Sequence, residues 1–230
     1  MKTESKKYKT RARNVEKTLP SSGRLLSRGA EATIHTQTIL GKKTIIKTRV
    51  PKPYRHAQLD AKLRKERTMR EAKLLHEIKK IGIDAPLLYS VNVPASQLIM
   101  EHVPFPRIKH ALQNKKNEKK FHEYCIEMGK IIARLHHHGI IHGDLTTSNF
   151  LIDTTPSPAR VYVIDLGLAF HSTQLEDQAV DLLNLKKTFE ATHSPISEGW
   201  SWVTQSYVEN NGKPTVIEKL KDVEKRIRYA

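Results

Sequence analysis

The sequence has little cysteine, few aromatic residues and no long hydrophobic run, and these shortages exclude several classes of protein. A single cysteine, Cys125, among 230 residues excludes an internal disulfide and suits a reducing compartment. No run approaches the roughly 20 apolar residues of a membrane-spanning helix, and residues 1–18 are polar and basic, without the apolar core of a secretory signal. We therefore expect a soluble intracellular protein.

Negative charge is also scarce, because 40 Lys and Arg residues face only 24 Asp and Glu residues and give a formal net charge of +16. Two interpretations stay open, namely solvated basic segments or an anionic partner such as RNA or an acidic protein surface. Because aromatic residues make up only 6% of the chain, we expect any RNA contact to run through phosphates rather than stacked bases. The 38% hydrophobic content supports a packed core in one domain or in two small lobes.

The run His-Gly-Asp-Leu-Thr-Thr-Ser-Asn at residues 142–149 is the most informative stretch. Asp144 can orient and deprotonate a hydroxyl group or a water molecule, and Asn149 offers an amide oxygen to Mg²⁺. A predicted strand at residues 161–164 ends at Asp165, followed by Leu and Gly, where a carboxylate suits a metal ligand that faces phosphates. In this order and at this spacing, the two motifs predict a kinase-type phosphoryl-transfer site.

Upstream of these motifs, the pattern predicts an antiparallel sheet and a long helix. Small residues in the turn after the first strand could cover a triphosphate with backbone N–H groups. The turn has one glycine and departs from G-x-G-x-x-G, so a plain hairpin turn is the alternative. The candidate nucleotide contacts in it are Arg28, Gly29, Ala30, Glu31 and Ala32. The expected elements are a strand from Leu25, strands at 33–40 and 44–49, a helix over about 59–80, and strands at 87–93 and 97–101.

Lys47 lies inside an apolar strand, where an unpaired ammonium group would be costly to bury. A role in binding phosphates explains it, and a side chain that extends to water is the alternative. Glu71 precedes the apolar pair Leu74 and Leu75 by one helical turn and so projects from the same inward face. We expect Glu71 to be the partner of Lys47, although spacing alone leaves Glu66 and Glu77 as competitors.

The apolar run that ends before Pro104 and Pro106 is typical of a hinge between two lobes. Its main chain at Met100, Glu101 and Val103 could meet an adenine edge. The domain boundaries that we expect are a basic tail over 1–20, an N-terminal kinase lobe over 21–103, and a C-terminal lobe over 104–230.

Beyond the hinge, the pattern predicts an exposed connection over 109–120 and a core helix over 121–138. The histidines at 136–138 point in different directions on that helix and favour no metal site. After Gly167 there is no long activation segment. Asp181 is expected to begin a helix, where it either braces the catalytic loop or complements the helix dipole as an exposed acid. Residues 214–228 are predicted to form a basic helical tail.

With these residues in view, the chain resembles the small atypical kinase of the KEOPS (EKC) complex, the p53-related protein kinase family. The resemblance extends from about Leu25 to the C-terminus, and the run at 142–149 followed by a strand ending in Asp-x-Gly is close to diagnostic. It is carried by residues 28–32, 54–56, 67–75, 142–149, 164–167, 176–177 and 180–182.

The resemblance implies an α+β fold, a reduced two-lobed protein-kinase-like fold with an antiparallel N-terminal sheet and a mainly helical C-terminal lobe. It implies an atypical Ser/Thr kinase and ATPase that binds ATP and Mg²⁺ and supports N6-threonylcarbamoyladenosine modification of tRNA. Its partners would be the catalytic tRNA-threonylcarbamoyl-transfer subunit and a small regulatory subunit, in cytoplasm and nucleus. Carried over by motif, Lys47 contacts phosphates, Glu71 holds Lys47, Asp144 is the catalytic acid or base, and Asn149 and Asp165 bind metal.

One residue agrees with this likeness while differing from many kinases, and one segment departs from it. Gly143 replaces the Arg with which many kinases receive a phosphorylated activation loop, so we expect that switch to be absent. The basic run at residues 225–228 is shorter than the usual family tail, which leaves its contact with the catalytic subunit open.

Three other functions compete with this interpretation. A small-molecule kinase of the aminoglycoside-phosphotransferase type uses similar motifs but usually adds a helical substrate pocket. A RIO-type kinase shares the short activation segment, although the sequence around Asp144 argues against it. A non-catalytic scaffold for protein and tRNA would have no chemical need to keep Lys47, Glu71, Asp144, Asn149 and Asp165 together.

Overall fold

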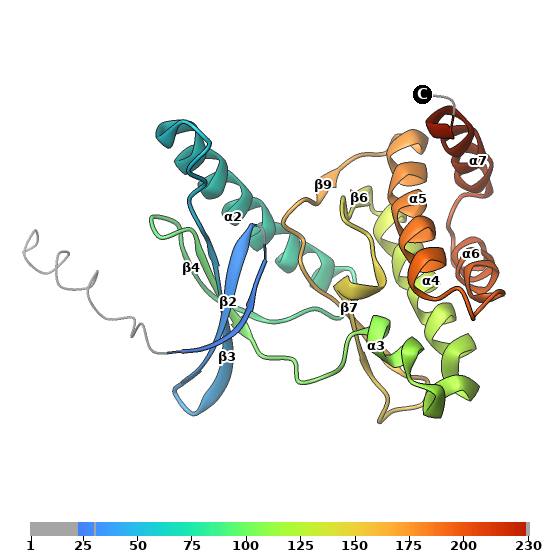
Figure 1. Ribbon diagram of the computed structural model, residues 1–230, viewed down its shortest axis with the longest axis horizontal. Helices are drawn as coiled ribbons and strands as arrows, with labels where there is room; N and C mark the ends of the chain where they lie inside the picture. Colours follow the sequence, from blue (N-terminus) through green and yellow to red (C-terminus); the bar gives the residue numbers. More distant parts are fainter. Residues whose placement is uncertain (1–22, 30, 229–230) are drawn as a thin grey trace, which may run out of the picture.

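An antiparallel sheet and one long helix form the N-terminal half of the chain (Figure 1). The structure is a computed structural model that describes residues 23–29 and 31–228, so Ala30 and the predicted tail at 1–20 lie outside the described residues. The strand order β1-β2-β3-β5-β4 places β3 at the centre of the sheet. The elements are β1 (Arg24–Arg28), β2 (Ala32–Ile39), β3 (Lys42–Arg49), α2 (Ala57–Lys80), β4 (Leu88–Asn92) and β5 (Gln97–Glu101).

The register of the central strand determines where Lys47 lies. The β2–β3 hairpin closes at Leu40 and Gly41, whose φ angles of 49° and 75° are the positive values that tight hairpin turns favour. From this turn, antiparallel pairing places Lys47 opposite Ile34 on β2, and β5 places Leu98 on its other side. Lys47 is therefore flanked by apolar residues on both sides, which is why its ammonium group needs a partner from another element.

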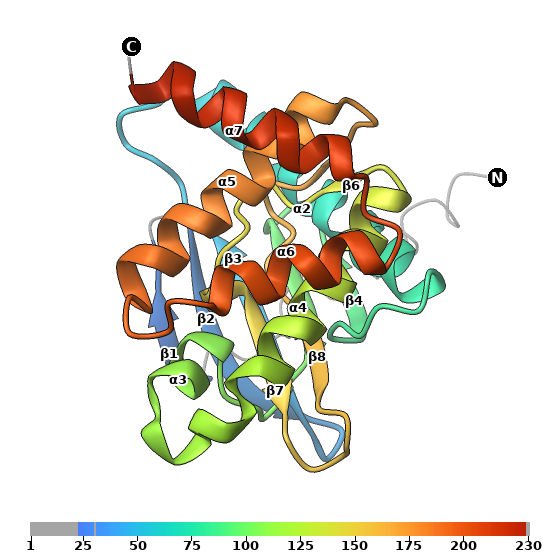
Figure 2. The ribbon, with the colours of Figure 1, turned by 90° about the vertical axis from the view of Figure 1, so that its right-hand side faces the viewer.

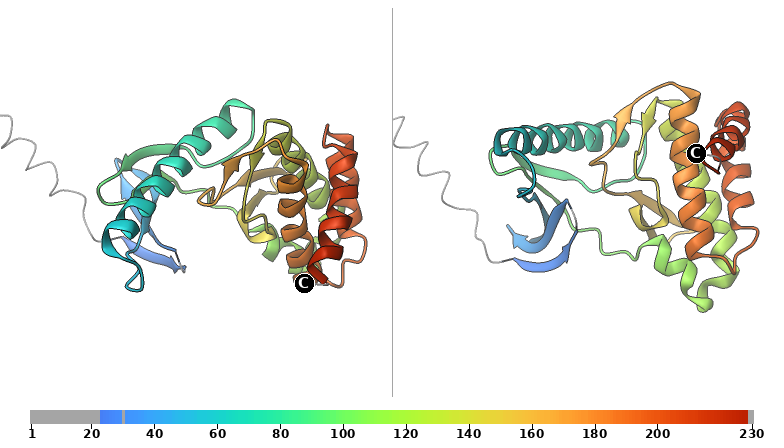
Figure 3. Two further views of the ribbon diagram at one scale, coloured as in Figure 1. Left: turned by 90° about the horizontal axis from the view of Figure 1, so that it is seen from above. Right: turned by 45° about the horizontal axis from the view of Figure 1, so that its top comes forward.

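Helix α2 extends from the sheet to the second lobe, as Figures 1 and 3 show. Its buried residues Leu74, Leu75 and Ile78 have the predicted helical spacing and pack in the same cluster as residues of the C-terminal half. Glu71 is 1% exposed on this inward face. One helix thus holds Glu71 under the sheet while its apolar residues fix it to the other lobe.

The C-terminal half is mainly helical, with α5, α6 and α7 toward the viewer in Figure 2. Two short ribbons, β6 with β9 and β7 with β8, carry the segments on either side of the catalytic motifs. The elements are α3 (Ile108–Gln113), η1 (Lys115–Lys120), α4 (Phe121–His137), β6 (Ile140–Ile141), η2 (Thr147–Asn149), β7 (Phe150–Asp153), β8 (Arg160–Val163), β9 (Phe170–His171), α5 (Leu175–Thr192), α6 (Gly199–Glu209) and α7 (Pro214–Arg228).

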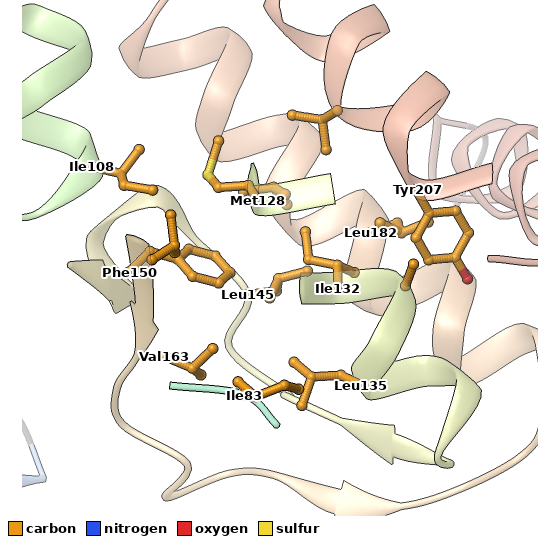
Figure 4. Packing of buried hydrophobic residues seen from close by; sticks show 14 of the residues in the cluster. Ile83, Ile108, Met128, Ile132, Leu135, Leu145, Phe150, Val163, Leu182 and Tyr207 are labelled. Atoms are coloured by element: carbon orange, nitrogen blue, oxygen red, sulfur yellow. The ribbon is translucent and has the colours of Figure 1, made fainter. Parts of the chain in front are cut away.

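The core of this half forms around α4 and supports the loops that carry the motifs (Figure 4). Met128 and Ile132 of α4 are fully buried, as are Leu145 of the catalytic loop and Phe150 and Val163 of the ribbon that follows it. Burial of a large apolar side chain contributes about 1.5–3 kcal/mol. The catalytic loop is therefore anchored by its own apolar residues. No helix in the described part of the chain is both long and apolar enough to cross a membrane.

Two sequence predictions about this half are wrong in detail. The expected exposed connection at 109–120 contains most of α3, which buries Ile108, Ala111 and Leu112, and then the short helix η1. Asp181 does not begin a helix, because α5 starts six residues earlier at Leu175. The predicted helix over 214–228 is confirmed as α7, and its Val216, Leu220 and Val223 pack in the core.

A close helix contact gives a test of this fold. Gly129 of α4 faces α6, and a Cβ added there would lie 2.5 Å from the carbonyl oxygen of Val203. Replacing Gly by Ala inside a helix ordinarily stabilises it by about 1 kcal/mol. We expect Gly129→Ala instead to lower the free energy of unfolding by about 1–3 kcal/mol because it overpacks this contact. Urea unfolding measures it, with the exposed Lys187→Ala expected to stay within about 0.5 kcal/mol. A stabilised Gly129→Ala would contradict the contact.

Candidate active site

The catalytic loop holds Asp144 and Asn149 together. The loop ends in the short helix η2, capped by Thr146, whose hydroxyl oxygen accepts from the Ser148 amide at 3.3 Å. Within this turn, Asn149 Nδ2 donates to the Asp144 carbonyl oxygen at 2.8 Å and to Asp144 Oδ2 at 3.0 Å. The amide nitrogen of Asn149 is therefore engaged, which leaves its side-chain oxygen for a cation, while Asp144 is exposed in the cleft.

The beginning of the loop is fixed by Asp181. Its Oδ2 accepts from the His142 amide at 2.8 Å, and its Oδ1 accepts from the Gly143 amide at 3.0 Å. Asp181 is 1% exposed and also lies 3.3 Å from His136 Nε2. The bracing role is therefore present in the structure, and the alternative of an exposed helix N-terminal acid is wrong.

His142 connects the loop to the strand that carries Asp165. Its Nε2 lies 3.2 Å from the Ile164 carbonyl oxygen, and its Nδ1 accepts from the Asp144 amide at 3.3 Å. Together these bonds place the ring proton on Nε2, the nitrogen that donates to the carbonyl. The main chain makes a second link, because the Ile164 amide donates to the Asn149 carbonyl oxygen at 3.0 Å.

Asp165 leaves β8 in a left-handed conformation, with a φ angle of 62°, which few non-glycine residues adopt. Its carboxylate oxygen Oδ1 accepts from Lys47 Nζ at 2.7 Å, and Lys47 Nζ also donates to Glu71 Oε1 at 2.8 Å. Burial acts to lower the pKa of Lys47, but the carboxylates of Glu71 and Asp165 outweigh it and hold that pKa above its ordinary value. Burial acts to raise the pKa of Asp165, and Lys47 overrides it and holds that pKa below its ordinary value. Lys47 and Asp165 are therefore both charged at neutral pH.

The two competitors of Glu71 lie elsewhere. Glu77 binds His171 Nε2 at 2.9 Å, and Glu66 lies 3.9 Å from Lys62 on the surface. The second carboxylate oxygen of Glu71 is also taken, because Arg49 Nη2 donates to it at 2.6 Å. Sequence reasoning missed Arg49. The available signal was its position two residues after Lys47, which places both side chains on one face of the strand.

A cavity of about 430 Å³ lies above this cluster, where the predicted phosphate-covering turn faces the catalytic loop. Gly29 uses its amide within the turn, donating to the Ala32 carbonyl oxygen at 2.9 Å. Glu31 turns outward to ion pairs with Arg67 and Arg55 of the α2 region. Gly29 is thus not the amide that would meet a phosphate, and Glu31 connects the turn to α2. The residues that line this cavity include Arg28, Gly29, Glu31, Ala32, Lys47, Arg49, Arg107, Asp144, Asn149 and Asp165.

A second cavity, of about 380 Å³, lies beside the hinge and shares Lys47, Asn149 and Asp165 with the first. Met100, Glu101 and Val103 line it, with apolar residues from β1, β2 and β3. The Glu101 amide already donates to the Leu87 carbonyl oxygen at 2.8 Å. This favours Val103 over Glu101 as the hinge residue that donates to an adenine edge.

The segment after Gly167 passes directly over Gly143. Gly143 has a φ angle of 77°, and a Cβ added there would lie 2.5 Å from the Leu168 carbonyl oxygen. The structure therefore has no room for a side chain at the position where many kinases carry the phosphate-receiving Arg.

The bracing bonds of Asp181 give a second test. Asp181→Ala leaves the amides of His142 and Gly143 without their acceptor, and each buried group left unpaired costs about 1–3 kcal/mol. We expect a correspondingly large fall in the free energy of unfolding, measured in urea. Glu176→Ala is the comparison, because its ion pairs with Lys219 and Arg226 are partly exposed and surface pairs of this kind stabilise a fold little. Equal losses in the two variants would argue against a special role for Asp181.

His193 gives a test by pH. It is 2% exposed, and its Nε2 lies 3.1 Å from the hydroxyl oxygen of Thr147 in the catalytic loop. Burial, with Lys109 nearby, lowers the pKa of His193 from 6.5 to about 4. As pH falls below 6.5, His193 becomes protonated in the unfolded chain but stays neutral in the folded chain. The free energy of unfolding therefore decreases with decreasing pH.

We expect the wild-type protein to lose about 2 kcal/mol more stability than His193→Gln between pH 7 and pH 5, from 1.36 kcal/mol per pH unit below 6.5. Urea unfolding at both pH values measures the difference. An identical loss in the two proteins would show that His193 titrates normally in the fold.

Comparison with known proteins gives consistent results. The model of the lipopolysaccharide kinase (Kdo/WaaP) family matches residues 27–207. The KEOPS complex subunit Bud32 of Pyrococcus abyssi is 37% identical over 216 residues, which cover 90% of this chain and 96% of that protein. A probable bifunctional tRNA threonylcarbamoyladenosine biosynthesis protein of Methanobrevibacter smithii is 38% identical over 208 residues, and this chain spans only 36% of its length.

Two solved structures share the fold at low identity. The Rio2 kinase of Chaetomium thermophilum, in an ADP/Mg²⁺-phosphoaspartate complex, has a TM-score of 0.65 at 15% identity, covering 96% of this chain and 75% of that chain. WaaP in complex with acyl carrier protein has a TM-score of 0.63 at 16% identity, covering 90% of this chain and 86% of that chain. The predicted α+β kinase-like fold is thereby confirmed. Since its likeness to Bud32 extends along nearly the whole of both chains, the protein belongs to the family of the KEOPS kinase subunit Bud32, a family of atypical kinases.

Proposed function

We propose that the chain is an ATP- and Mg²⁺-dependent atypical Ser/Thr kinase and ATPase that acts in a KEOPS complex and supports N6-threonylcarbamoyladenosine modification of tRNA. One observation carries the chemical part of this proposal. Asp144, Asn149 and Asp165 converge from two segments on a cavity that Lys47 also lines, with its ammonium group bound to Asp165. Phosphoryl transfer needs this set, since a base, metal ligands and a cation for the phosphates must meet at one place.

The donor set suits Mg²⁺. Asp165 supplies a charged carboxylate, and the side-chain oxygen of Asn149 is neutral and left over once its nitrogen binds Asp144. Hard cations prefer such oxygen ligands and are commonly bound by one or two protein groups together with phosphate oxygens. Bound there, the ion would neutralise charge on the phosphates.

The protein's own groups have distinct roles in this mechanism. Asp144 accepts a proton from the attacking hydroxyl group or water, and its bond from Asn149 Nδ2 fixes the carboxylate for that task. Lys47 binds the phosphates with an ammonium group held in place by Glu71. The hinge cavity receives the base, with Val103 as donor and Met100 as an apolar wall.

The acceptor is proposed to be water or a residue of a partner subunit. The segment between Gly167 and the start of α5 at Leu175 is short and passes against Gly143, so it forms no extended platform for a peptide. Proteins named for tRNA threonylcarbamoyladenosine biosynthesis contain a region like this chain as 36% of a longer polypeptide. A catalytic partner working beside this fold fits that arrangement, as does a small regulatory subunit.

The net charge of +16 supports contact with tRNA in the assembled complex. The proposed location is the cytoplasm, and also the nucleus in a cell that has one. We also propose that the boundary between the two lobes lies at the hinge, near residue 103.

ATP hydrolysis by the purified protein tests the function. We expect low activity alone and a marked rise when the tRNA-modifying partner subunit and tRNA are added. Asp144→Ala and Asp165→Asn should each lose the activity, because general-base catalysis contributes about 10²–10⁴-fold and Asp165 holds the cation. The partly exposed Asp84→Asn is the matched control, because Asp84 pairs with Arg160 outside the two cavities.

Two results would contradict the proposal. Modified tRNA formed at the wild-type rate with Asp165→Asn would indicate a scaffold without chemistry. Strong phosphorylation of added peptides, indifferent to the partner, would indicate an ordinary Ser/Thr kinase.

A further inference from the structure

Arg49 is a buried cation that the mechanism above leaves unused. It ends β3, two residues after Lys47, and is 4% exposed. Its Nη2 donates to Glu71 Oε2 at 2.6 Å, but its Nε and Nη1 have no hydrogen-bond partner among the described residues. Buried N–H groups of a charged side chain are rarely left unpaired, because losing water without a replacement is costly.

The position of Arg49 indicates which ligand it serves. It lines the 430 Å³ cavity together with Lys47, Asp144, Asn149 and Asp165, the residues assigned above to phosphates and metal. It also packs against the turn after Asp165, since a Cβ added to Gly167 would lie 2.6 Å from Arg49 Nη2. The guanidinium group thus lies between β3, α2 and the Asp165 turn, next to the place where polyphosphate would bind.

The charges of the cluster support the same conclusion. Lys47 and Arg49 carry two positive charges, and Glu71, which bonds to both, carries one negative charge. Asp165, the fourth member, is 47% exposed at the side chain and is the group assigned to the cation. Apart from Asp165, the cluster therefore keeps one net positive charge, whereas Lys47 and Glu71 alone would be neutral. In a buried site such a charge is screened little by solvent.

We propose that Arg49 is a second cation of the phosphate-binding cavity, which uses its unpaired N–H edge and its charge to bind the polyphosphate of a nucleoside di- or triphosphate. This inference rests on the proposed function, because it assumes that the cavity takes a nucleotide. It assigns to Glu71 a second task, that of dividing its single negative charge between two cations so that neither is fully neutralised.

Calorimetric binding of ADP and of adenosine, both with added Mg²⁺, tests the inference, because the charge count above assigns Asp165 to that cation. We expect Arg49→Met to weaken ADP binding about tenfold, on the order of one partly screened charge contact, and to leave adenosine binding within about twofold. Arg49→Lys should restore most of the ADP affinity. Arg64→Met is the matched control, because Arg64 pairs with Asp60 in the same lobe and does not line the cavity.

A double variant separates charge from structure. Arg49→Met combined with Glu71→Gln removes one charge of each sign and returns the net charge to that of the wild type. We expect its ADP affinity to lie between that of Arg49→Met and that of the wild type, because the net charge is restored while the N–H edge of Arg49 is not. This variant also leaves no carboxylate without its cation, so it serves if Arg49→Met alone does not fold.

The outcomes divide cleanly. Equal loss of ADP and adenosine binding in Arg49→Met, no loss of either, or a double variant no better than the single one would each overturn the role of Arg49 while leaving the proposed function intact. A wild-type protein that binds neither ligand would overturn both.

Discussion

The structure depends on a buried network of ion pairs among Lys47, Arg49 and Glu71, with Asp165 at its solvent-exposed side. Removing such groups from water is expensive, and the cost is recovered only when each charge has a close partner of opposite sign. Here the partners come from β3, from α2 and from the turn after β8. Three elements that are distant in sequence can satisfy one another only in a single arrangement, so the cluster specifies how the sheet, the helix and the second lobe meet.

Asp181 is the counterpart of this cluster in the second lobe. It accepts from two consecutive amides at the start of the catalytic loop, while Leu145 and Phe150 anchor the loop by burial. The loop is therefore held by main-chain bonds on one side and by the apolar core on the other. Asp144 is left as the exposed group of a rigid segment, which is the condition under which a catalytic carboxylate keeps its geometry.

The parts that sequence predicted well are those with a strong period or a chemical necessity. Hairpin strands, the apolar face of α2 and the contact between Lys47 and Glu71 follow from alternation, from helical spacing and from the cost of an unpaired lysine. Helix α3 was not predicted, because its three buried residues among six are too few to show a helical period and the segment that follows is rich in lysine. The sequence could not show that Glu71 has two cationic partners. Lys47 and Arg49 share a strand face, and only the tertiary structure shows that one carboxylate binds both.

The close approach of Gly143 to Leu168 has a consequence for how this protein could change over time. A side chain at that position would need both a strained left-handed backbone and a displaced main chain at Leu168. A single substitution to Arg would therefore damage the loop without rebuilding a phosphate receptor. Acquisition of such a receptor would require concerted change in two segments, so on-off control of this fold is more accessible through association with other molecules than through modification of its own chain.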